Sequence, residues 1–284
     1  MTAKVLSSSD GVTFLPSWVH AKDPSDAPLR VLHEDGTLHF SDLKKIADSG
    51  VQYLYGLTRP FEPTRAMLIG TGVHHLALGD RPTSKVAFFP GDKRVGKEWT
   101  AFKAEHEGFD ILTRPERDDA EQIAAAVLLD PVAREYMAGA RFEVPLQWKD
   151  GDVPCSTTGV DIVQPGRIGD LKTTNTTEIE KWQRQAFSFS YHCQMAWYRR
   201  GCVANGIDVS RGMFLLGVDV KPPHEVVVLE MSEDLIDLAE RTVSLWLEKF
   251  KVFSESKQFP GRAQSAVVWS VPAWMREEEE ADDA

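Results

Sequence analysis

The 284-residue sequence predicts an α/β fold in which helices flank a mixed central β-sheet. Residues 141–148 alternate apolar and polar side chains, which is typical of a strand with one buried face. Residues 213–220 form an almost continuous apolar run, as expected of a central strand, and residues 225–231 predict the strand that follows it. Residues 232–253 repeat apolar side chains at helical spacing, which predicts a long amphipathic helix.

The composition is that of a globular protein, with 26% charged and 42% hydrophobic residues. No apolar run approaches the roughly 20 residues needed to span a bilayer, and the first residues lack the apolar core of a signal peptide. We therefore expect a cytoplasmic protein without membrane partners. The three cysteines show no C-x-x-C spacing, so they predict reduced thiols and indicate neither a disulfide framework nor a zinc site.

The net charge of −11 argues, by itself, against nucleic-acid binding, because phosphate contacts require local lysine and arginine. Part of this charge lies in the last nine residues, which contain six acidic side chains and predict a solvated, disordered tail. The remaining chain is only mildly acidic, as expected of a site rich in metal-binding carboxylates. We divide the chain into an irregular N-terminal arm (1–37), a main domain (38–272) and an acidic tail (273–284).

The stretch most informative about chemistry is residues 159–174, which predict a β-hairpin. Pro165 and Gly166 suit the two central positions of a tight turn, because proline presets φ and glycine accepts positive φ. With a turn of two residues, Asp161 lies opposite Asp170. Opposed carboxylates destabilise a strand pair, and a divalent metal held by oxygen ligands is the usual solution.

Side-chain alternation places Lys172 on the same face as Asp170, while Leu171 points the other way into a core. In the same register Gly159 lies opposite Lys172, which would leave the ammonium room to move. A surface hairpin with scattered charges is the alternative at this point, because the D-x-K pattern is common.

Two predicted helices carry further candidates. A helix from Pro63 to about Leu78 places His74 on an apolar face, where a lone histidine is more often a satisfied core residue than a ligand. The adjacent His75 cannot share that face. A second helix, expected to end at Gly201, aligns the side chains of Tyr191, Gln194 and Tyr198, although an aromatic stripe of this kind is usually core.

The segment between these helices is less regular. Residues 80–118 are polar and interrupted, and predict either a basic, flexible DNA-facing segment or an ordinary surface connection. Residues 116–137 predict a helix that Pro131 must break or kink.

Taken in order over roughly residues 38–255, the motifs resemble the RecB-like and exonuclease VIII (RecE)-like branch of the PD-(D/E)xK nucleases. The matching features are a helix whose G-T-x-x-H motif ends at His74, a strand carrying Glu143, Asp161, the Asp170-Leu171-Lys172 triplet, and a Q-x-x-x-Y motif from Gln194 to Tyr198. The resemblance implies a restriction-endonuclease-like core, and it reverses the expectation that His74 is merely a core residue.

The resemblance also implies a metal site. Asp161, Asp170 and the backbone carbonyl of Leu171 would bind Mg²⁺ or Mn²⁺, and His74 and Glu143 would complete a second metal position. For Glu143, a solvated charge on a half-buried strand remains an equal alternative. An iron–sulfur cluster, which some relatives carry on four cysteines, is not expected with three scattered ones.

By the same resemblance, Lys172 would orient or deprotonate the attacking water, and Tyr191, Gln194 and Tyr198 would contact DNA. The implied activity is a metal-dependent DNA exonuclease that resects duplex ends for recombination or repair. Implied partners are DNA ends, a single-strand annealing protein and further copies of the chain, in a bacterial host if the gene is phage-encoded. A structure-specific or single-strand endonuclease and an inactive DNA-binding module remain alternatives.

Overall fold

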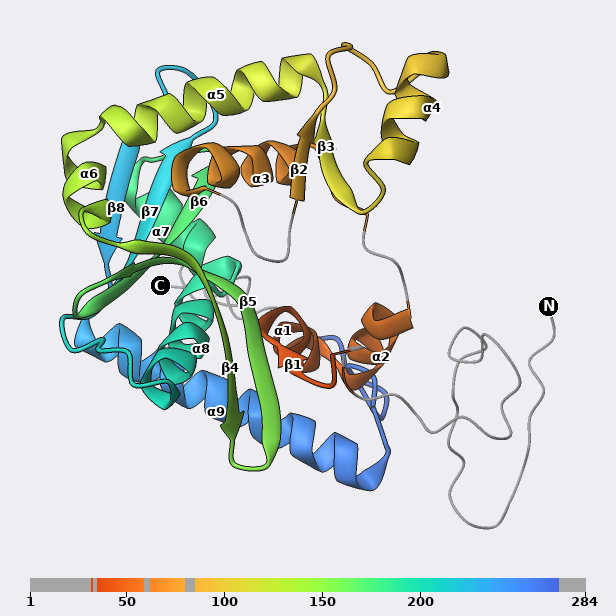
Figure 1. The fold of residues 1–284 in the computed structure, drawn as a ribbon. Helices are drawn as coiled ribbons and strands as arrows, with labels where there is room; N and C mark the ends of the chain where they lie inside the picture. The colour runs from red at the N-terminus through yellow and green to blue at the C-terminus, as the bar shows by residue number, and fades with distance from the viewer. Residues whose placement is uncertain (1–31, 33–34, 59–61, 80–84, 271–284) are drawn as a thin grey trace, which may run out of the picture.

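The computed structural model describes residue 32 and residues 35–58, 62–79 and 85–270. Most of the predicted N-terminal arm (1–37) and the whole predicted acidic tail (273–284) lie outside the described residues. Within these ranges, helices cover both faces of a six-stranded mixed sheet, which confirms the predicted α/β fold (Figure 1). None of the described helices is both long enough and apolar enough to cross a membrane.

The central sheet forks at its longest strand. Its strands are β1 (Leu38–His39), β4 (Arg141–Asp150), β5 (Val153–Gln164), β6 (Arg167–Thr174), β7 (Met213–Asp219) and β8 (Val226–Glu230). Strand β4 pairs antiparallel with β5 along one edge. The other edge of β5 is shared, because β1 pairs with Cys155 and Ser156 whereas β6 pairs with residues 162–164. Residues 157–161 of β5 therefore face the gap between β1 and β6.

The hairpin between β5 and β6 has the predicted two-residue turn. Gln164 pairs with Arg167 across it, and Gly166 adopts a φ of 83°, which glycine tolerates at no steric cost. The pairing continues to Ile162 opposite Gly169 and stops there. Asp161 and Asp170 occupy the next position in this register, where the two strands begin to separate.

Two helical layers enclose the sheet. One face is covered by α3 (Arg65–Leu78), α5 (Arg114–Leu129) and α6 (Pro131–Met137). The other is covered by α1 (Phe40–Asp48), α2 (Gly50–Thr58), α7 (Ile179–Ser188), α8 (Tyr191–Ala204) and α9 (Glu233–Ser256). Strand alternation distributes side chains between the layers: Leu216 packs against the first layer and Leu215 against the second. Leu171 lies in the first core, as predicted.

Local signals set the helix boundaries near the site. Helix α3 begins at Arg65, two residues after the predicted start at Pro63, because the Thr64 side chain caps it by accepting a hydrogen bond from the Met67 N–H. The helix predicted over 116–137 is broken as expected, and α6 starts at Pro131. The Asp130 carboxylate caps this second helix.

The predicted end of α8 at Gly201 is wrong, because the helix continues to Ala204. A Cβ atom at Gly201 would lie 2.9 Å from the Trp148 ring. Glycine is therefore present so that α8 can approach β4 closely, and not because the helix stops there.

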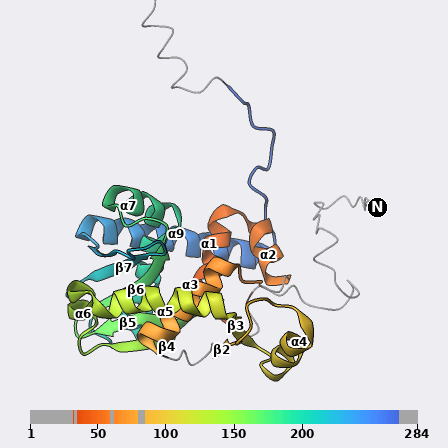
Figure 2. The ribbon, with the colours of Figure 1, turned by 90° about the horizontal axis from the view of Figure 1, so that it is seen from above.

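The described part of residues 80–118, predicted to be a flexible DNA-facing segment or a surface connection, contains regular elements. It forms a parallel pair of strands, β2 (Lys85–Phe88) and β3 (Phe109–Leu112), joined through α4 (Gly96–Glu105). A small core of its own holds this unit together, made of Ala87, Phe89 and Ile111 with Trp99, Phe102 and Phe109 packed against them. The unit projects from one side of the main sheet (Figure 2).

Candidate active site

The two carboxylates of the predicted hairpin lie at the fork of the sheet. Asp161 and Asp170 are 2% and 1% exposed, so both are almost completely removed from water. Asp161 Oδ2 accepts a hydrogen bond of 2.9 Å from the backbone N–H of Leu171. The carboxylate thus takes the place of a strand partner where the regular pairing has ended, and this holds it against β6.

Glu143 reaches the same point from β4. It is 1% exposed and has a φ of 50°, in the left-handed region that side chains rarely adopt. This conformation interrupts the alternation of the strand, so that Phe142 packs in one core and Val144 in the other. The prediction that residues 141–148 alternate with one buried face is therefore wrong at Phe142 and Val144, and the interruption is what turns Glu143 inward.

Gly159 makes room for Glu143. A Cβ atom at Gly159 would lie 2.6 Å from Glu143 Oε2 and 3.3 Å from the Glu143 backbone. The expectation that Gly159 leaves space for Lys172 is wrong, because β5 and β6 have already separated at this level. The glycine instead permits β4 and β5 to bring a glutamate and an aspartate together.

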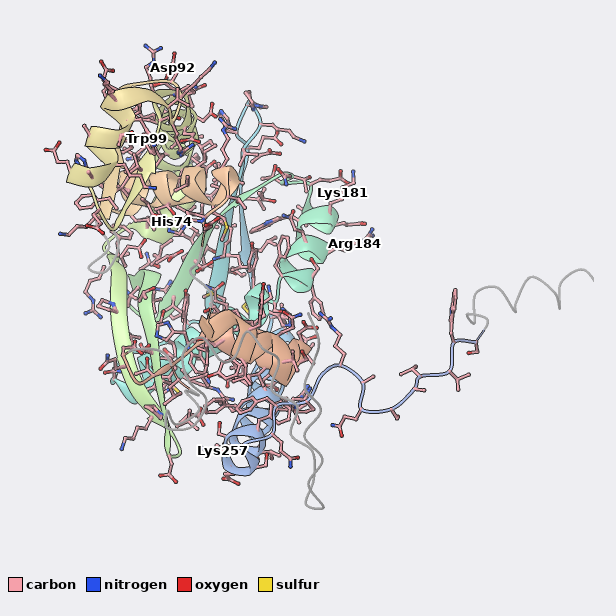
Figure 3. All side chains as sticks on the ribbon, turned by 90° about the vertical axis from the view of Figure 1, so that its right-hand side faces the viewer. His74, Asp92, Trp99, Lys181, Arg184 and Lys257 are labelled. Carbon is pink, nitrogen blue, oxygen red and sulfur yellow. The ribbon has the colours of Figure 1, made fainter. Side chains whose placement is uncertain are left out.

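Helix α3 contributes His74, which points from the helix toward the strands (Figure 3). Its Nε2 donates a hydrogen bond of 2.8 Å to the Leu171 carbonyl, while Nδ1 lies 3.3 Å from Glu143 Oε1 and 3.5 Å from Asp161 Oδ2. His75 points elsewhere, against the ring of Phe88, as the expectation of different faces requires.

These residues fit a divalent metal ion. The potential ligand atoms of His74, Glu143 and Asp161 all lie within 4.8 Å of one another, and all three residues are buried. Asp170 adds an Oδ1 atom that is buried without a hydrogen bond. Burial, and then the charge of Asp161, raises the pKa of Asp170 to about 6. Clustered buried carboxylates of this kind require a compensating cation, and oxygen and imidazole ligands suit divalent metals.

Lys172 supplies one cation to this cluster. Its Nζ lies 2.5 Å from Asp170 Oδ2 and 4.8 Å from the centre of the Tyr191 ring. Burial acts to lower the pKa of Lys172, but the Asp170 and Asp161 carboxylates outweigh it and raise that pKa above its usual range. Lys172 is therefore an ammonium group.

Helix α8 borders the site with the three side chains predicted to share a face. The Tyr198 hydroxyl accepts a hydrogen bond of 2.7 Å from Gln194 Nε2 and lies close enough to the carboxylates that burial, then Asp170 and Asp161, raise its pKa. Gln194 is thus held by Tyr198, and Tyr191 lies against Lys172.

A second lysine near the site was not identified from the sequence. Lys44 on α1 donates a hydrogen bond to the carbonyl of Phe189, just before α8, and its pKa is lowered by burial and then by the positive charge of Lys172. The sequence does not indicate this position, because Lys44 meets Phe189, 145 residues away in the chain, only through tertiary packing.

No curated protein matches the chain. The crystal structure of a candidate exonuclease from Eubacterium rectale is similar over 85% of this chain and 92% of its own, with a TM-score of 0.56 and 16% identity. A phage-related exonuclease from Haemophilus somnus is similar over 65% of this chain and 95% of its own, with a TM-score of 0.32 and 15% identity.

At 16% identity, the likeness to the Eubacterium rectale protein concerns the fold alone. The family assignment comes from the sequence, because residues 39–269 match the model of a PDDEXK-like domain of unknown function, DUF3799. The match spans most of the chain, and the chain belongs to this family of PDDEXK-like domains.

Proposed function

We propose that this protein is a divalent-metal-dependent deoxyribonuclease, an exonuclease that resects duplex DNA ends for recombination or repair. The observation that carries the proposal is the convergence of His74, Glu143, Asp161 and Asp170 with Lys172 at the fork of a PDDEXK-like sheet. An intact set of buried ligands beside a charged lysine favours an active enzyme over an inactive DNA-binding module.

His74, Glu143, Asp161, Asp170 and the Leu171 carbonyl would hold Mg²⁺ or Mn²⁺. When bound, the metal would lower the pKa of a water molecule and offset charge at the phosphate. The chain's own contribution is positional: Leu171 fixes the ring of His74 through its carbonyl, and fixes Asp161 through its N–H. These contacts set the direction of both side chains before any substrate arrives.

Lys172 is assigned to the substrate. Because its pKa is raised, it would act as a charged hydrogen-bond donor that orients the attacking water or offsets charge on the scissile phosphate, and less readily as a base. The face formed by Tyr191, Gln194 and Tyr198 would contact the DNA beside it. A single-strand annealing protein and further copies of the chain are the partners that the resemblance implies.

The proposal specifies an exonuclease and not merely a nuclease. The similarity in fold to the candidate exonuclease from Eubacterium rectale supports this choice. The test is to incubate the protein with linear and circular duplex DNA of one sequence, in Mg²⁺, Mn²⁺ or EDTA. We expect metal-dependent loss of the linear DNA alone. Cleavage of the circular DNA would favour the endonuclease alternative, and intact DNA in every metal would contradict nuclease function.

A further inference from the structure

An aromatic strip continues from the candidate site along the junction of α7 and α8. It consists of Phe189 and Tyr191, whose ring centres lie 5.6 Å apart. Tyr191 adjoins Lys172, whereas Phe189 is 44% exposed although it is large and apolar. The strip thus leads from the catalytic lysine out to the surface, and ends in an uncovered ring.

Two lysines flank the strip. Lys172 Nζ lies 4.8 Å from the Tyr191 ring centre, and Lys44 Nζ lies 5.6 Å from the Phe189 ring centre. Lys44 also donates a hydrogen bond of 2.9 Å to the Phe189 carbonyl. The order is therefore Lys172, Tyr191, Phe189 and Lys44, with the two rings between two cations, on a protein whose net charge is −11.

The residue between the two rings has an unusual backbone. Ser190 adopts a φ of 61°, in the left-handed region where side chains other than glycine, asparagine and aspartate are uncommon. Such conformations persist where the surrounding structure enforces them, and they cluster at ligand-binding sites. Here the conformation lies between the end of α7 and the start of α8, where the two rings emerge next to each other.

We propose that Phe189, Tyr191 and Lys44 bind the unpaired nucleotides of a single-stranded DNA end beside the candidate active site. Exposed rings bind bases by stacking without regard to sequence, and neighbouring lysines bind the connecting phosphates. The bases of a duplex are already stacked on one another, so a platform of this kind selects unpaired ones. The inference rests on the proposed function, because it specifies the form of the DNA that the same site receives.

Binding of a fluorescent single-stranded oligonucleotide, measured by anisotropy in EDTA to prevent cleavage, tests the platform directly. Phe189→Ala should weaken the affinity roughly tenfold, whereas Phe189→Tyr should retain it because the ring face remains. Phe187→Ala is the matched control, since Phe187 is 52% exposed but stacks on His192 and lines a cavity with Leu229. Equal affinities of Phe189→Ala and wild type would overturn the proposal.

The role of Lys44 has a separate measurement. Lys44→Gln should lower the slope of log affinity against log salt concentration by about 0.7, the value for one phosphate contact on a single strand. Lys181→Gln is the control with the same change of charge, since Lys181 is an exposed residue on α7 (Figure 3). An unchanged slope for Lys44→Gln would remove Lys44 from the platform.

The two proposals can fail independently. If wild type degrades linear DNA but Phe189→Ala binds single strands equally well, the platform is wrong and the nuclease assignment stands. If wild type cleaves no DNA yet binds single strands in a manner that depends on Phe189, the platform stands and the nuclease assignment is wrong.

Discussion

At the Asp170–Lys172 pair, burial and charge act differently on the two partners. Asp170 is so desolvated, and so close to Asp161, that its pKa stays above the usual carboxyl value even beside an ammonium group. Lys172 faces two carboxylates, and this attraction exceeds the cost of its own burial. The metal-free site therefore has an excess of negative charge that a single lysine does not offset.

Lys172→Ala should abolish DNA hydrolysis while leaving the protein folded. The loss should be at least about a hundredfold in kcat, as for removal of other groups that stabilise developing charge. The metal-free variant should also melt below wild type, because Asp170 loses its nearest cation. Lys181→Ala provides the control for removal of an exposed lysine. Substantial nuclease activity in folded Lys172→Ala would remove this residue from the mechanism.

Asp170→Asn should have the opposite effect on stability. An acid whose pKa is raised by folding destabilises the native state above that pKa, about 6 here, and has no such effect below the unfolded value of 3.8. In EDTA the variant should therefore melt above wild type at pH 8, and the difference should shrink as the pH falls toward 4. Calorimetry across this range checks the prediction, and a difference independent of pH would contradict it.

At the scale of the elements, the sequence predicts features that depend on neighbouring residues, such as turns. It does not predict features that depend on contacts between distant segments. The Pro165-Gly166 turn fixes the hairpin by itself, so the register of Asp161 and Asp170 could be predicted. The left-handed backbone of Glu143 could not, because it depends on the absence of a side chain at Gly159 on another strand.

Contacts between distant segments also explain why the sequence failed to predict the unit at 85–112 and the true end of α8. The unit at 85–112 was missed because its core is assembled from aromatic residues in separate segments, which produce no single period. Gly201 has the sequence context of a helix end, and only the position of Trp148 shows that it is a packing glycine. The fork between β1 and β6, which opens the site, depends on β1. This strand has only two residues, too few to show an alternating pattern in the sequence.

Gly159→Ala tests whether the contact between β4 and β5 positions Glu143. The added methyl group must displace the Glu143 carboxylate, and overpacking of this kind costs about 1 to 3 kcal/mol. We expect a lower melting temperature and a weaker affinity for Mn²⁺, measured by titration calorimetry. Gly261→Ala is the control, because nothing lies within 4 Å of its Cβ position. Wild-type metal affinity in Gly159→Ala would show that Glu143 is not a ligand.

At the scale of the whole molecule, the candidate site joins elements that belong to different layers. Glu143, Asp161 and Asp170 come from three strands of the central sheet, and His74 comes from a helix that covers one face of it. Helix α8, which borders the site, belongs to the layer on the other face. A cation held at this point would link both cores, so its binding should resist global unfolding and not merely order a surface loop.

Mg²⁺ or Mn²⁺ should therefore raise the stability of the entire domain. Mass action gives about 2.7 kcal/mol at a hundredfold excess over the dissociation constant, if the unfolded chain does not bind the metal. Asp161→Asn should lose most of this gain, whereas Asp152→Asn, which removes an exposed carboxylate at the turn between β4 and β5, should keep it. Chemical denaturation with and without EDTA measures the effect through the shift of the midpoint at constant slope. A wild-type midpoint indifferent to millimolar divalent metal, or an equal shift in Asp161→Asn, would mean that the buried carboxylates of the fork do not form the metal site.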